Sequence, residues 1–579
     1  MSTLDIHPDR RHYRPSDPAD PALLLDARTV AEALVERARR EPAAVAYYLP
    51  DEPEADRRIT VSDLLVRAHA AGAALIAAGV TPGARVCLCL DTSAPLLAGL
   101  FGAALAGAVP SVLEPPLTAG RRELWLDRVR HIAAVAQPAV LVCDDLLRAD
   151  LEAALDGSGV TVISPPFGYG AVAQPVLGSR PDDPAFMQFT SGTTGAAKGI
   201  VLSHRAVFAA AAAIGGGGPF LDGDVMVSWL PLHHDMGMIG ATLTPFLLSL
   251  PSVLVRPMAF GSKPDRWLRL IHEYRGTLSP APNFAYRLVT AVARRTDLGE
   301  LDLSSWRAAF NGAEVVDAAT LHDFLDLTAR YGFHPRHLRP CYGMAELGLA
   351  ATFSPVGTSP RVELLSRSAL TEGRAVPPES DDDAHPYVSC GVPVPGVKIR
   401  VADESGLDAG DARVGRILVS AESMMSGYLE GAGAANPVLE LHDGWLDTGD
   451  LGFQLGGELF VTGRSKDLVI LAGRNYQPQP FELAAETVAG IRPGGAAAVG
   501  VLDPATGTER LVLVVETKHH RDAGMCAATA DEVTDVVSRR TGVRPGRVLV
   551  VPPRTLPKTS SGKLQRPRVA ALVVAGTIG

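Results

Sequence analysis

FMQFTSGTTGAAKGIVLSH, residues 186–204, is the stretch from which the fold of this chain can first be inferred. Its six residues Thr190–Gly195 are all Thr, Ser or Gly, and Lys198 follows them. Glycine lets a backbone approach an anion closely, and free N–H groups and hydroxyls donate to phosphate oxygens. Apolar residues on both sides predict a loop between two strands. The Gly-Lys-Ser/Thr ending of the common ATPase loop is absent from this stretch.

Strands and helices alternate on both sides of this stretch. The segments 85–90, 110–115 and 139–145 have the composition of short buried strands, and 29–42 and 59–80 have helical spacing. Such an alternation predicts parallel sheets. From residue 397 the pattern changes to short β-rich pieces, which predict a small barrel or sheet that closes the large domain.

A domain boundary is expected at residues 463–467. Beyond it, segments such as 496–503 and 509–517 predict a compact α+β unit. The predicted fold class is therefore a large α/β amino-terminal domain, residues 1–465, with parallel sheets and a small β-barrel-like part. A small mobile α+β domain, residues 466–579, follows it.

Composition excludes several classes of protein. The chain has 579 residues, 47% hydrophobic and 20% charged, which is typical of a globular protein. A net charge of −10 without a polybasic run argues against nucleic acid and anionic membranes as partners. The first twenty residues have no apolar core, and 92–113 is predicted to be a buried helix leading into a strand, so no membrane span is expected. Six scattered cysteines favour a cytoplasmic location.

Four further motifs follow in order: CYGMAELGLAATF (341–353), GWLDTGDLGF (444–453), GRSKDLVILAGRN (463–475) and LPKTSSGKLQR (556–566). Together with the first stretch they resemble the core motifs of the adenylate-forming superfamily, which includes acyl-CoA synthetases, adenylation domains and luciferases. The resemblance runs from about residue 30 to residue 566. Three more segments narrow it to fatty acyl-AMP ligases: WLPLHHDMGMIG (229–240), SPAPNFAYRL (279–288) and VSCGVPVPG (388–396).

The resemblance implies a binding site for ATP and Mg²⁺. Its Gly/Ser/Thr loop and lysine would hold the phosphates, NGAE would frame the adenine, and Tyr342 would pack on it. Glu346 would bind Mg²⁺, and Asp450 would accept hydrogen bonds from the ribose with the help of Arg464. The implied nucleotide-binding residues are Thr190, Ser191, Gly192, Thr193, Thr194, Gly195, Lys198, Asn311, Gly312, Ala313, Glu314, Tyr342, Gly343, Met344, Asp450 and Arg464.

The resemblance also implies the catalytic and substrate-binding residues. Lys563 would reach from the small domain to the α-phosphate and the carboxylate, with Lys558 as the competing lysine. Glu346 and His234 would complete the catalytic set, and Lys466 would be the hinge about which the small domain rotates. The expected substrate-binding residues are His233, Asp235, Met236, Gly237, Asn283 and Phe284.

The expected activity is ATP-dependent formation of acyl-AMP from a fatty or related carboxylic acid, then acyl transfer to the phosphopantetheine of an acyl carrier protein. A polar segment, bracketed by 354–387, resembles the insertion with which such ligases restrain their small domain and disfavour coenzyme A. An acidic carrier would need a basic patch, for which Arg336, Arg339 and Arg568 are candidates. The apolar and amide side chains of PNFAY disfavour an α-amino acid substrate.

Three alternatives remain open at this point. The chain would be an acyl-CoA synthetase if coenzyme A were the acceptor. It would be a ligase for an unusual aromatic or short acid if His233 made the pocket more polar than usual. An inactive scaffold that binds acyl chains or a carrier is the third, and the presence of Lys563, Glu346 and Asp450 argues against it.

Overall fold

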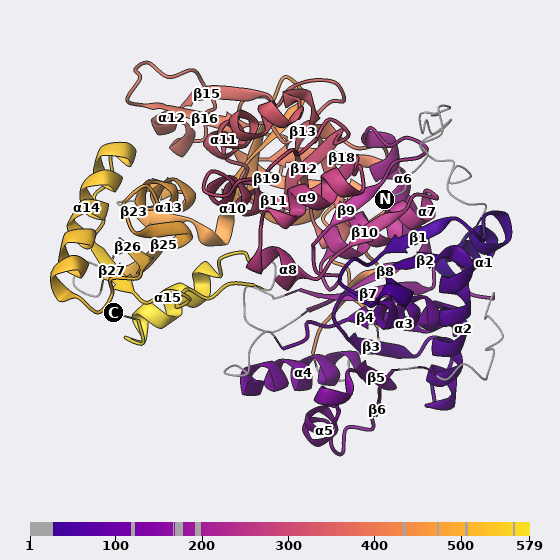
Figure 1. The fold of residues 1–579 in the computed structure, drawn as a ribbon. Coiled ribbons are helices and arrows are strands. Elements are labelled where there is room, and N and C mark those ends of the chain that lie inside the picture. The colour runs from indigo at the N-terminus through magenta and orange to yellow at the C-terminus, as the bar shows by residue number, and fades with distance from the viewer. Residues whose placement is uncertain are drawn as a thin grey trace.

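The computed structural model describes residues 27–116, 122–165, 167, 178–190, 198–431, 436–471, 474–503, 508–559 and 562–578. Layers of sheet and helix make up most of the chain, and the last hundred residues form a smaller body beside them (Figure 1). We call residues 469–578 the small lobe and the preceding described residues the large lobe. The α/β class predicted from the sequence, with its large parallel sheet, is confirmed.

The largest sheet has nine strands in the order β17-β14-β13-β12-β11-β9-β10-β1-β2. Its central strands, from β13 to β1, run parallel to one another. The strands are β1 (Val45–Tyr48), β2 (Arg58–Thr60), β9 (Met226–Ser228), β10 (Ser252–Leu254), β11 (Leu278–Pro282), β12 (Ala308–Gly312), β13 (Leu338–Gly343), β14 (Ala350–Phe353) and β17 (Val392–Pro393).

A second parallel sheet has the order β4-β3-β5-β6 and contains the three strands predicted in the first 150 residues. Beside it the antiparallel strands β7 and β8 flank the Gly/Ser/Thr run, as predicted. The strands are β3 (Arg85–Cys89), β4 (Val109–Val112), β5 (Val140–Cys143), β6 (Thr161–Ile163), β7 (Pro184–Thr190), β8 (Lys198–Ser203) and β20 (Gly427–Leu429).

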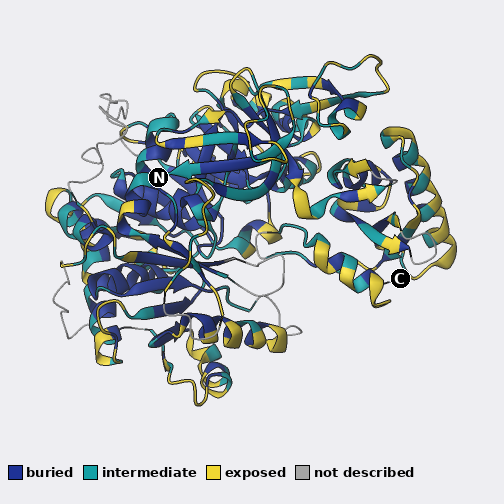
Figure 2. Cartoon of the chain, turned by 180° about the vertical axis from the view of Figure 1, so that it is seen from behind, coloured by how far each residue is buried: buried dark blue, intermediate teal, exposed yellow. Residues whose placement is uncertain are grey.

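Helices cover both sheets. They are α1 (Val30–Arg40), α2 (Val61–Ala77), α3 (Ala94–Leu105), α4 (Arg122–Ala136), α5 (Asp145–Ala154), α6 (His204–Gly217), α7 (Thr244–Leu247), α8 (Pro257–Ser262), α9 (Arg266–Glu273), α10 (Asn283–Ala293), α11 (Ala318–Thr328) and α12 (Arg367–Thr371). Figure 2 shows dark blue, buried residues along the strands of the large lobe and yellow mainly on outer helices and loops.

Local sequence explains how α2 and α3 form and pack. A capping box between Thr60 and Asp63 begins α2, and the Ser93 hydroxyl accepts the N–H of Leu96 at the start of α3. The two helices pack closely because Gly102 has no side chain. A Cβ at that position would lie 2.7 Å from the Cβ of Ala71. The uncharged run predicted to be a buried helix is therefore α3, which leads into β4.

The β-rich part predicted after residue 397 is a four-stranded antiparallel sheet with the order β18-β19-β21-β22. A separate hairpin of β15 and β16 lies within the predicted insertion. The strands are β15 (Val362–Ser366), β16 (Ala384–Val388), β18 (Val397–Ala402), β19 (Gly415–Ala421), β21 (Leu446–Leu455) and β22 (Glu458–Arg464).

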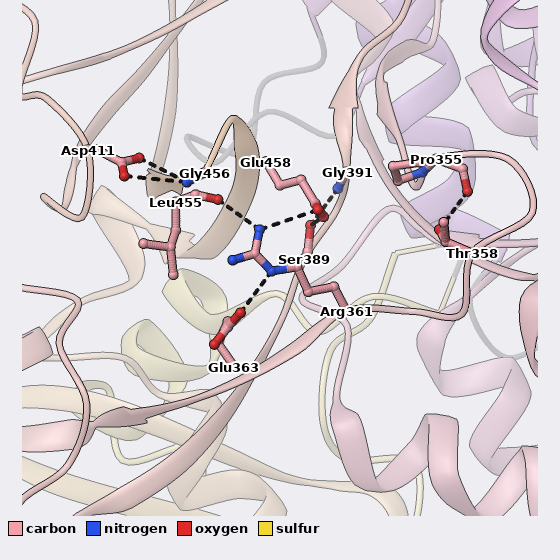
Figure 3. Close-up of polar contacts among 10 residues, drawn as sticks. All are labelled: Pro355, Thr358, Arg361, Glu363, Ser389, Gly391, Asp411, Leu455, Gly456 and Glu458. Carbon is pink, nitrogen blue, oxygen red and sulfur yellow. Dashed lines mark hydrogen bonds and ion pairs between the residues drawn. The ribbon is translucent and has the colours of Figure 1, made fainter.

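Arg361 fastens the base of this hairpin to the β21–β22 turn (Figure 3). Its Nη1 donates to the Leu455 carbonyl oxygen at 2.9 Å, and its Nε donates to Glu363 Oε1 at 2.8 Å. Glu458 accepts from both Arg361 and the Ser389 hydroxyl. Near the other end of the hairpin, in α12, Arg367 Nη1 donates to the Arg540 carbonyl oxygen in the small lobe at 2.5 Å. The hairpin therefore touches both lobes.

Replacement of Arg361 by alanine is expected to loosen the hairpin without unfolding the large lobe. The lost bonds to charged and carbonyl partners are together worth about 1–2 kcal/mol at a partly exposed position. We expect faster amide exchange in β15 and β16, measured by hydrogen–deuterium exchange, and little change in β12 or β13. Arg374→Ala is the control, because Arg374 pairs with Glu372 within one turn. Equal exchange in both variants would contradict the anchoring role.

The small lobe has cores of its own. Two clusters of buried apolar side chains, around Leu513 and around Val514, contain residues only from 469 onward. The three-stranded sheet β25-β26-β27 lies between these clusters. The elements are β23 (Val469–Leu471), β24 (Arg474–Tyr476), α13 (Gln479–Ala485), β25 (Ile491–Asp503), β26 (Thr508–Thr517), α14 (Ala523–Thr541), β27 (Arg547–Val551) and α15 (Arg566–Val574). None of the helices in the described ranges combines the length and apolar character needed to cross a bilayer.

Candidate active site

Four neighbouring strands of the nine-stranded sheet end at one edge. β9, β11, β12 and β13 run parallel, so the residues after their carboxyl ends come together there. Those residues belong to the motifs singled out from the sequence. The run 229–236 follows β9, Asn283 follows β11, Ala313 and Glu314 follow β12, and 344–346 follow β13.

A cavity of about 2250 Å³ lies between this edge and the small lobe. Most of the predicted site residues line it, although they come from segments more than 300 residues apart. The predicted residues on its wall are Lys198, His233, His234, Asp235, Met236, Asn283, Phe284, Ala313, Glu314, Tyr342, Gly343, Met344, Glu346, Asp450, Arg464, Lys466 and Lys563.

Lys563 enters the cavity from the small lobe on a tight turn. The Lys563 N–H donates to the Thr559 hydroxyl at 3.1 Å, and the Thr559 N–H donates back to the Lys563 carbonyl at 2.7 Å. Lys558 also lies on the cavity wall, but its Nζ donates to the Gly494 carbonyl at 2.6 Å. Lys558 is thus held within its own lobe, and Lys563 is placed to act on the large lobe.

Two adjacent histidines face the lysine across the cavity. Burial lowers the pKa of His233 to about 3. Burial also lowers the pKa of His234 well below its usual range, and the neighbouring His233 and the positive charge of Lys563 lower it further. Both rings are therefore neutral at physiological pH, so His234 can donate a hydrogen bond to a carboxylate but carries no charge.

Two half-buried carboxyl groups lie on the cavity wall with the lysine. Burial raises the pKa of Asp235 and of Glu314, and the charge of Lys563 opposes the rise in each case. Glu314 also accepts a hydrogen bond from the Phe284 N–H. The cavity therefore holds acidic groups whose negative charge is poorly solvated, which favours a bound cation.

Asp450 connects two parts of the predicted nucleotide site. The Tyr342 hydroxyl donates to Asp450 Oδ2 at 2.7 Å, and Arg464 Nε donates to Oδ1 at 3.0 Å. Each carboxylate oxygen has a second lone pair, so Asp450 can still accept two hydroxyl donors. The aromatic ring and the carboxylate are thus fixed relative to each other.

Glu346 lies on the same wall beside Tyr428. The Tyr428 hydroxyl donates to Glu346 Oε1 at 2.7 Å. Burial raises the pKa of Glu346, and the negative charge of Asp235 contributes to the rise. One carboxylate is enough for Mg²⁺ when phosphate oxygens and water complete its shell. The buried charge of Glu346 and its acidic neighbour fit such an ion.

Lys198 makes two contacts at the end of this wall. Its Nζ lies 2.5 Å from Glu430 Oε1 and 5.1 Å from the centre of the Tyr428 ring. A phosphate bound by Lys198 would therefore compete with Glu430. The preceding predicted phosphate ligands Ser191–Gly195 lie outside the described residues.

Comparison with known proteins identifies the family. The model of the AMP-binding enzyme family matches residues 34–429, about two thirds of the chain. The chain belongs to the AMP-binding enzymes.

Several proteins resemble this AMP-binding enzyme over most of their length. A putative acyl-CoA synthetase of Caulobacter vibrioides is 33% identical over 87% of this chain and 88% of its own. The medium-chain-fatty-acid–[acyl-carrier-protein] ligase JamA of Moorena producens is 32% identical, covering 85% and 86%. A solved structure from work on fatty acyl-adenylate ligases of E. coli and L. pneumophila is 32% identical, with a TM-score of 0.84 over 96% and 99%.

Three predicted site residues lie behind the wall of the cavity in this AMP-binding enzyme. Asn311 is buried and its Nδ2 donates to Asn283 Oδ1 at 3.1 Å, so it supports a wall residue. A Cβ on Gly312 would lie 2.7 Å from Cys341 Sγ, and one on Gly237 would lie 2.2 Å from the Pro231 carbonyl oxygen. These two glycines permit close packing, and neither is among the described residues that line the cavity.

One prediction for the carrier surface is wrong. Arg339 is 1% exposed, and its Nη2 donates to the Ser354 carbonyl, so it cannot form part of a basic surface patch. Arg336 and Arg568 are exposed. Arg339 was a candidate because an acidic carrier would need a basic patch, and arginine is seldom fully buried.

Sequence reasoning also missed several residues of the site. Tyr428 and Glu430 lie in and directly after the short strand β20, which no predicted motif covers. Tyr428 reaches the cavity, and Glu430 reaches the wall residue Lys198, because β20 pairs with β8, more than 200 residues earlier in the chain. No local pattern of residues signals such a contact.

Proposed function

We propose that this AMP-binding enzyme joins a fatty or related carboxylic acid to AMP from ATP, releases pyrophosphate, and passes the acyl group to the phosphopantetheine thiol of an acyl carrier protein. The observation that carries the proposal is the entry of Lys563 into the cavity beside His234 and the carboxyl groups. The names of the similar ligases and of the similar solved structure support the same chemistry.

The residues on the cavity wall fit the demands of this reaction. A carboxylate and a triphosphate repel each other, so the site needs a positive charge at the reacting atoms. Lys563 would supply that charge and stabilise the negative charge that develops on the α-phosphate. Neutral His234 would orient the carboxylate without neutralising it. Ribose hydroxyls would donate to Asp450, which Tyr342 and Arg464 hold in place.

Mg²⁺ would be held by Glu346 together with phosphate oxygens. The ion would supply positive charge that counters the repulsion between the two anionic reactants. Tyr428 would orient the carboxylate of Glu346. We propose that the boundary between the two domains lies at 465/466, with Lys466 as the hinge. This residue lies in the exposed turn η8 (Ser465–Asp467), which joins β22 to the small lobe.

A carrier protein as acceptor and a cytoplasmic location also belong to the proposal. The contact between the predicted insertion and the small lobe, through Arg367, supports restraint of that lobe and hence the carrier over coenzyme A. The name of the Caulobacter vibrioides relative favours coenzyme A as the second candidate acceptor. All six cysteines are free thiols, which fits a reducing compartment.

The test follows the products by mass spectrometry. The enzyme is mixed with ATP, Mg²⁺ and straight-chain acids from butanoate to hexadecanoate, or benzoate, with either coenzyme A or a phosphopantetheinylated carrier as the thiol. We expect acyl-AMP in both mixtures and acyl transfer only to the carrier. Rapid conversion to acyl-CoA would assign the enzyme to the synthetases, and absence of any acyl-AMP would contradict the proposed activity.

A further inference from the structure

An ion pair joins the two lobes at the helix that borders the cavity. Arg287, on α10, places its Nη1 2.8 Å from Glu486 Oε2, at the end of α13 in the small lobe. The side chains are 23% and 8% exposed. Figure 1 shows α10 next to β25 and α13. The two atoms are close but are not aligned as a hydrogen bond, so the contact is one between charges.

The same face of α10 also meets the turn that carries Lys563. Phe284 lies three residues before Arg287, so the two side chains project from one side of the helix. A Cβ built on Gly562 would lie 2.9 Å from the Phe284 ring, which places the turn directly against that ring. The ion pair and the catalytic turn therefore contact the large lobe side by side.

Within the small lobe, Glu486 is connected to both ends of the Lys563 turn. Lys558, before the turn, donates to the Gly494 carbonyl at 2.6 Å, and both the charge of Lys558 and the Gly494 N–H lower the pKa of Glu486. Arg566, after the turn, holds Glu482 with two bonds of 2.8 and 2.7 Å. Glu482 lies one helical turn before Glu486 on α13. Contacts within the small lobe thus link the position of Glu486 to the position of Lys563.

We propose that Arg287 is a positioning residue that holds the small lobe, and with it Lys563, against the cavity through its ion pair with Glu486. It would support formation of acyl-AMP, and transfer of the acyl group from acyl-AMP would not depend on it. The inference rests on the proposed function, because its main readout is acyl-AMP formation.

The charge balance around Glu486 indicates how the pair can be tested. Burial raises the pKa of Glu486 to about 7; the charge of Arg287, the Gly494 N–H and the charge of Lys558 oppose the rise, and the charge of Glu482 adds to it. Without Arg287, the pKa would rise further, and the closed lobe would have to bury an unpaired carboxylate or protonate it. Protonation of Glu486 becomes easier as the pH falls, so a lower pH should restore the activity that is lost without Arg287.

The experiment compares Arg287→Ala with wild type. It measures, at two pH values, the release of pyrophosphate that depends on the carboxylic acid substrate. In the variant, the small lobe would close with Glu486 protonated. Relative to wild type, this lowers the rate tenfold for each pH unit above the wild-type pKa of Glu486, which is about 7. We therefore expect a loss of about tenfold at about pH 8 and less than about twofold at about pH 6. Dividing by the wild-type rate at each pH removes the titration of the substrate and of other groups.

Two controls separate positioning from other effects. Arg294→Ala removes an arginine near the other end of α10, whose partner Asp323 lies within the large lobe, and we expect no pH-dependent loss. In a Glu486→Gln background no buried charge needs a partner, so adding Arg287→Ala should change the rate by less than about twofold at either pH. A direct effect of Arg287 on Glu314 would instead persist in that background.

The outcomes distinguish the two proposals. If wild type forms acyl-AMP and Arg287→Ala matches it at about pH 8, or loses activity equally at both pH values, the positioning role is overturned. If wild type forms no acyl-AMP from any acid, the proposed function fails instead. Acyl transfer from supplied acyl-AMP should be unchanged in the variant, and a parallel loss there would contradict a role confined to activation.

Discussion

Lys563→Ala is expected to lower formation of acyl-AMP by roughly 100- to 1000-fold, the loss typical when a group that stabilises transition-state charge is removed. The physical reason is the repulsion between the incoming carboxylate and the phosphates, which the lysine charge offsets. Quantitative release of pyrophosphate with a saturating acid is the measurement. Arginine at this position should restore little, because the turn around Gly562 fixes where the charge lies.

Lys558→Ala is the matched control for this prediction. Lys558 lies five residues earlier in the same motif, yet its Nζ donates to the Gly494 carbonyl. We therefore expect Lys558→Ala to lower acyl-AMP formation only moderately, by weakening a contact within the small lobe. Thermal unfolding should show that Lys563→Ala retains the wild-type fold, because this side chain borders the cavity. A Lys563→Ala enzyme with near-normal pyrophosphate release, beside an inactive Lys558→Ala enzyme, would reverse the assignment.

Glu346→Gln is expected to reduce the same reaction by about 100-fold and to weaken the response to Mg²⁺. The amide keeps the size of the side chain and can accept from Tyr428, but it removes the negative charge that would bind the cation. Titration of the rate with Mg²⁺ is the measurement, and the half-saturating concentration should rise in the variant. Chelation of the metal should abolish activity in wild type.

A second variant shows whether the effect is specific. Glu440→Gln removes an exposed carboxylate elsewhere on the large lobe, and its Mg²⁺ dependence should equal that of wild type. If Glu346→Gln keeps the wild-type Mg²⁺ dependence and loses only maximal rate, Glu346 serves the reaction in some way other than by binding the ion.

Much of the fold could be predicted from local patterns. Neighbouring residues carry the apolar pattern and spacing that indicate buried strands and helices. This pattern predicts the strands 85–90 and 139–145 and the helix within 92–113. The order of the nine-stranded sheet could not be predicted in this way. It depends on which buried faces meet after residues far apart in sequence have come together, as when β1 pairs with β10.

The candidate site, too, could be predicted from the sequence only in part. The sequence motifs named Lys563, Glu346, Asp450 and His234, and these residues line one cavity. Motifs did not distinguish a residue that faces the cavity from one that packs behind it, which is why Gly237 was predicted to contact substrate. The expectation of a basic patch for the carrier placed Arg339 on the surface, whereas the folded chain buries it.

The sequence by itself determined the class of fold, the family and the chemical types of the site residues, because each depends on side chains close together along the chain. Only the tertiary structure decided which groups meet. Tyr342 bonds to Asp450 across 108 residues, and Arg287 pairs with Glu486 across the two lobes. Distance and alignment set the strength of these contacts, and both arise only when parallel strands end at one edge and a second lobe closes over it.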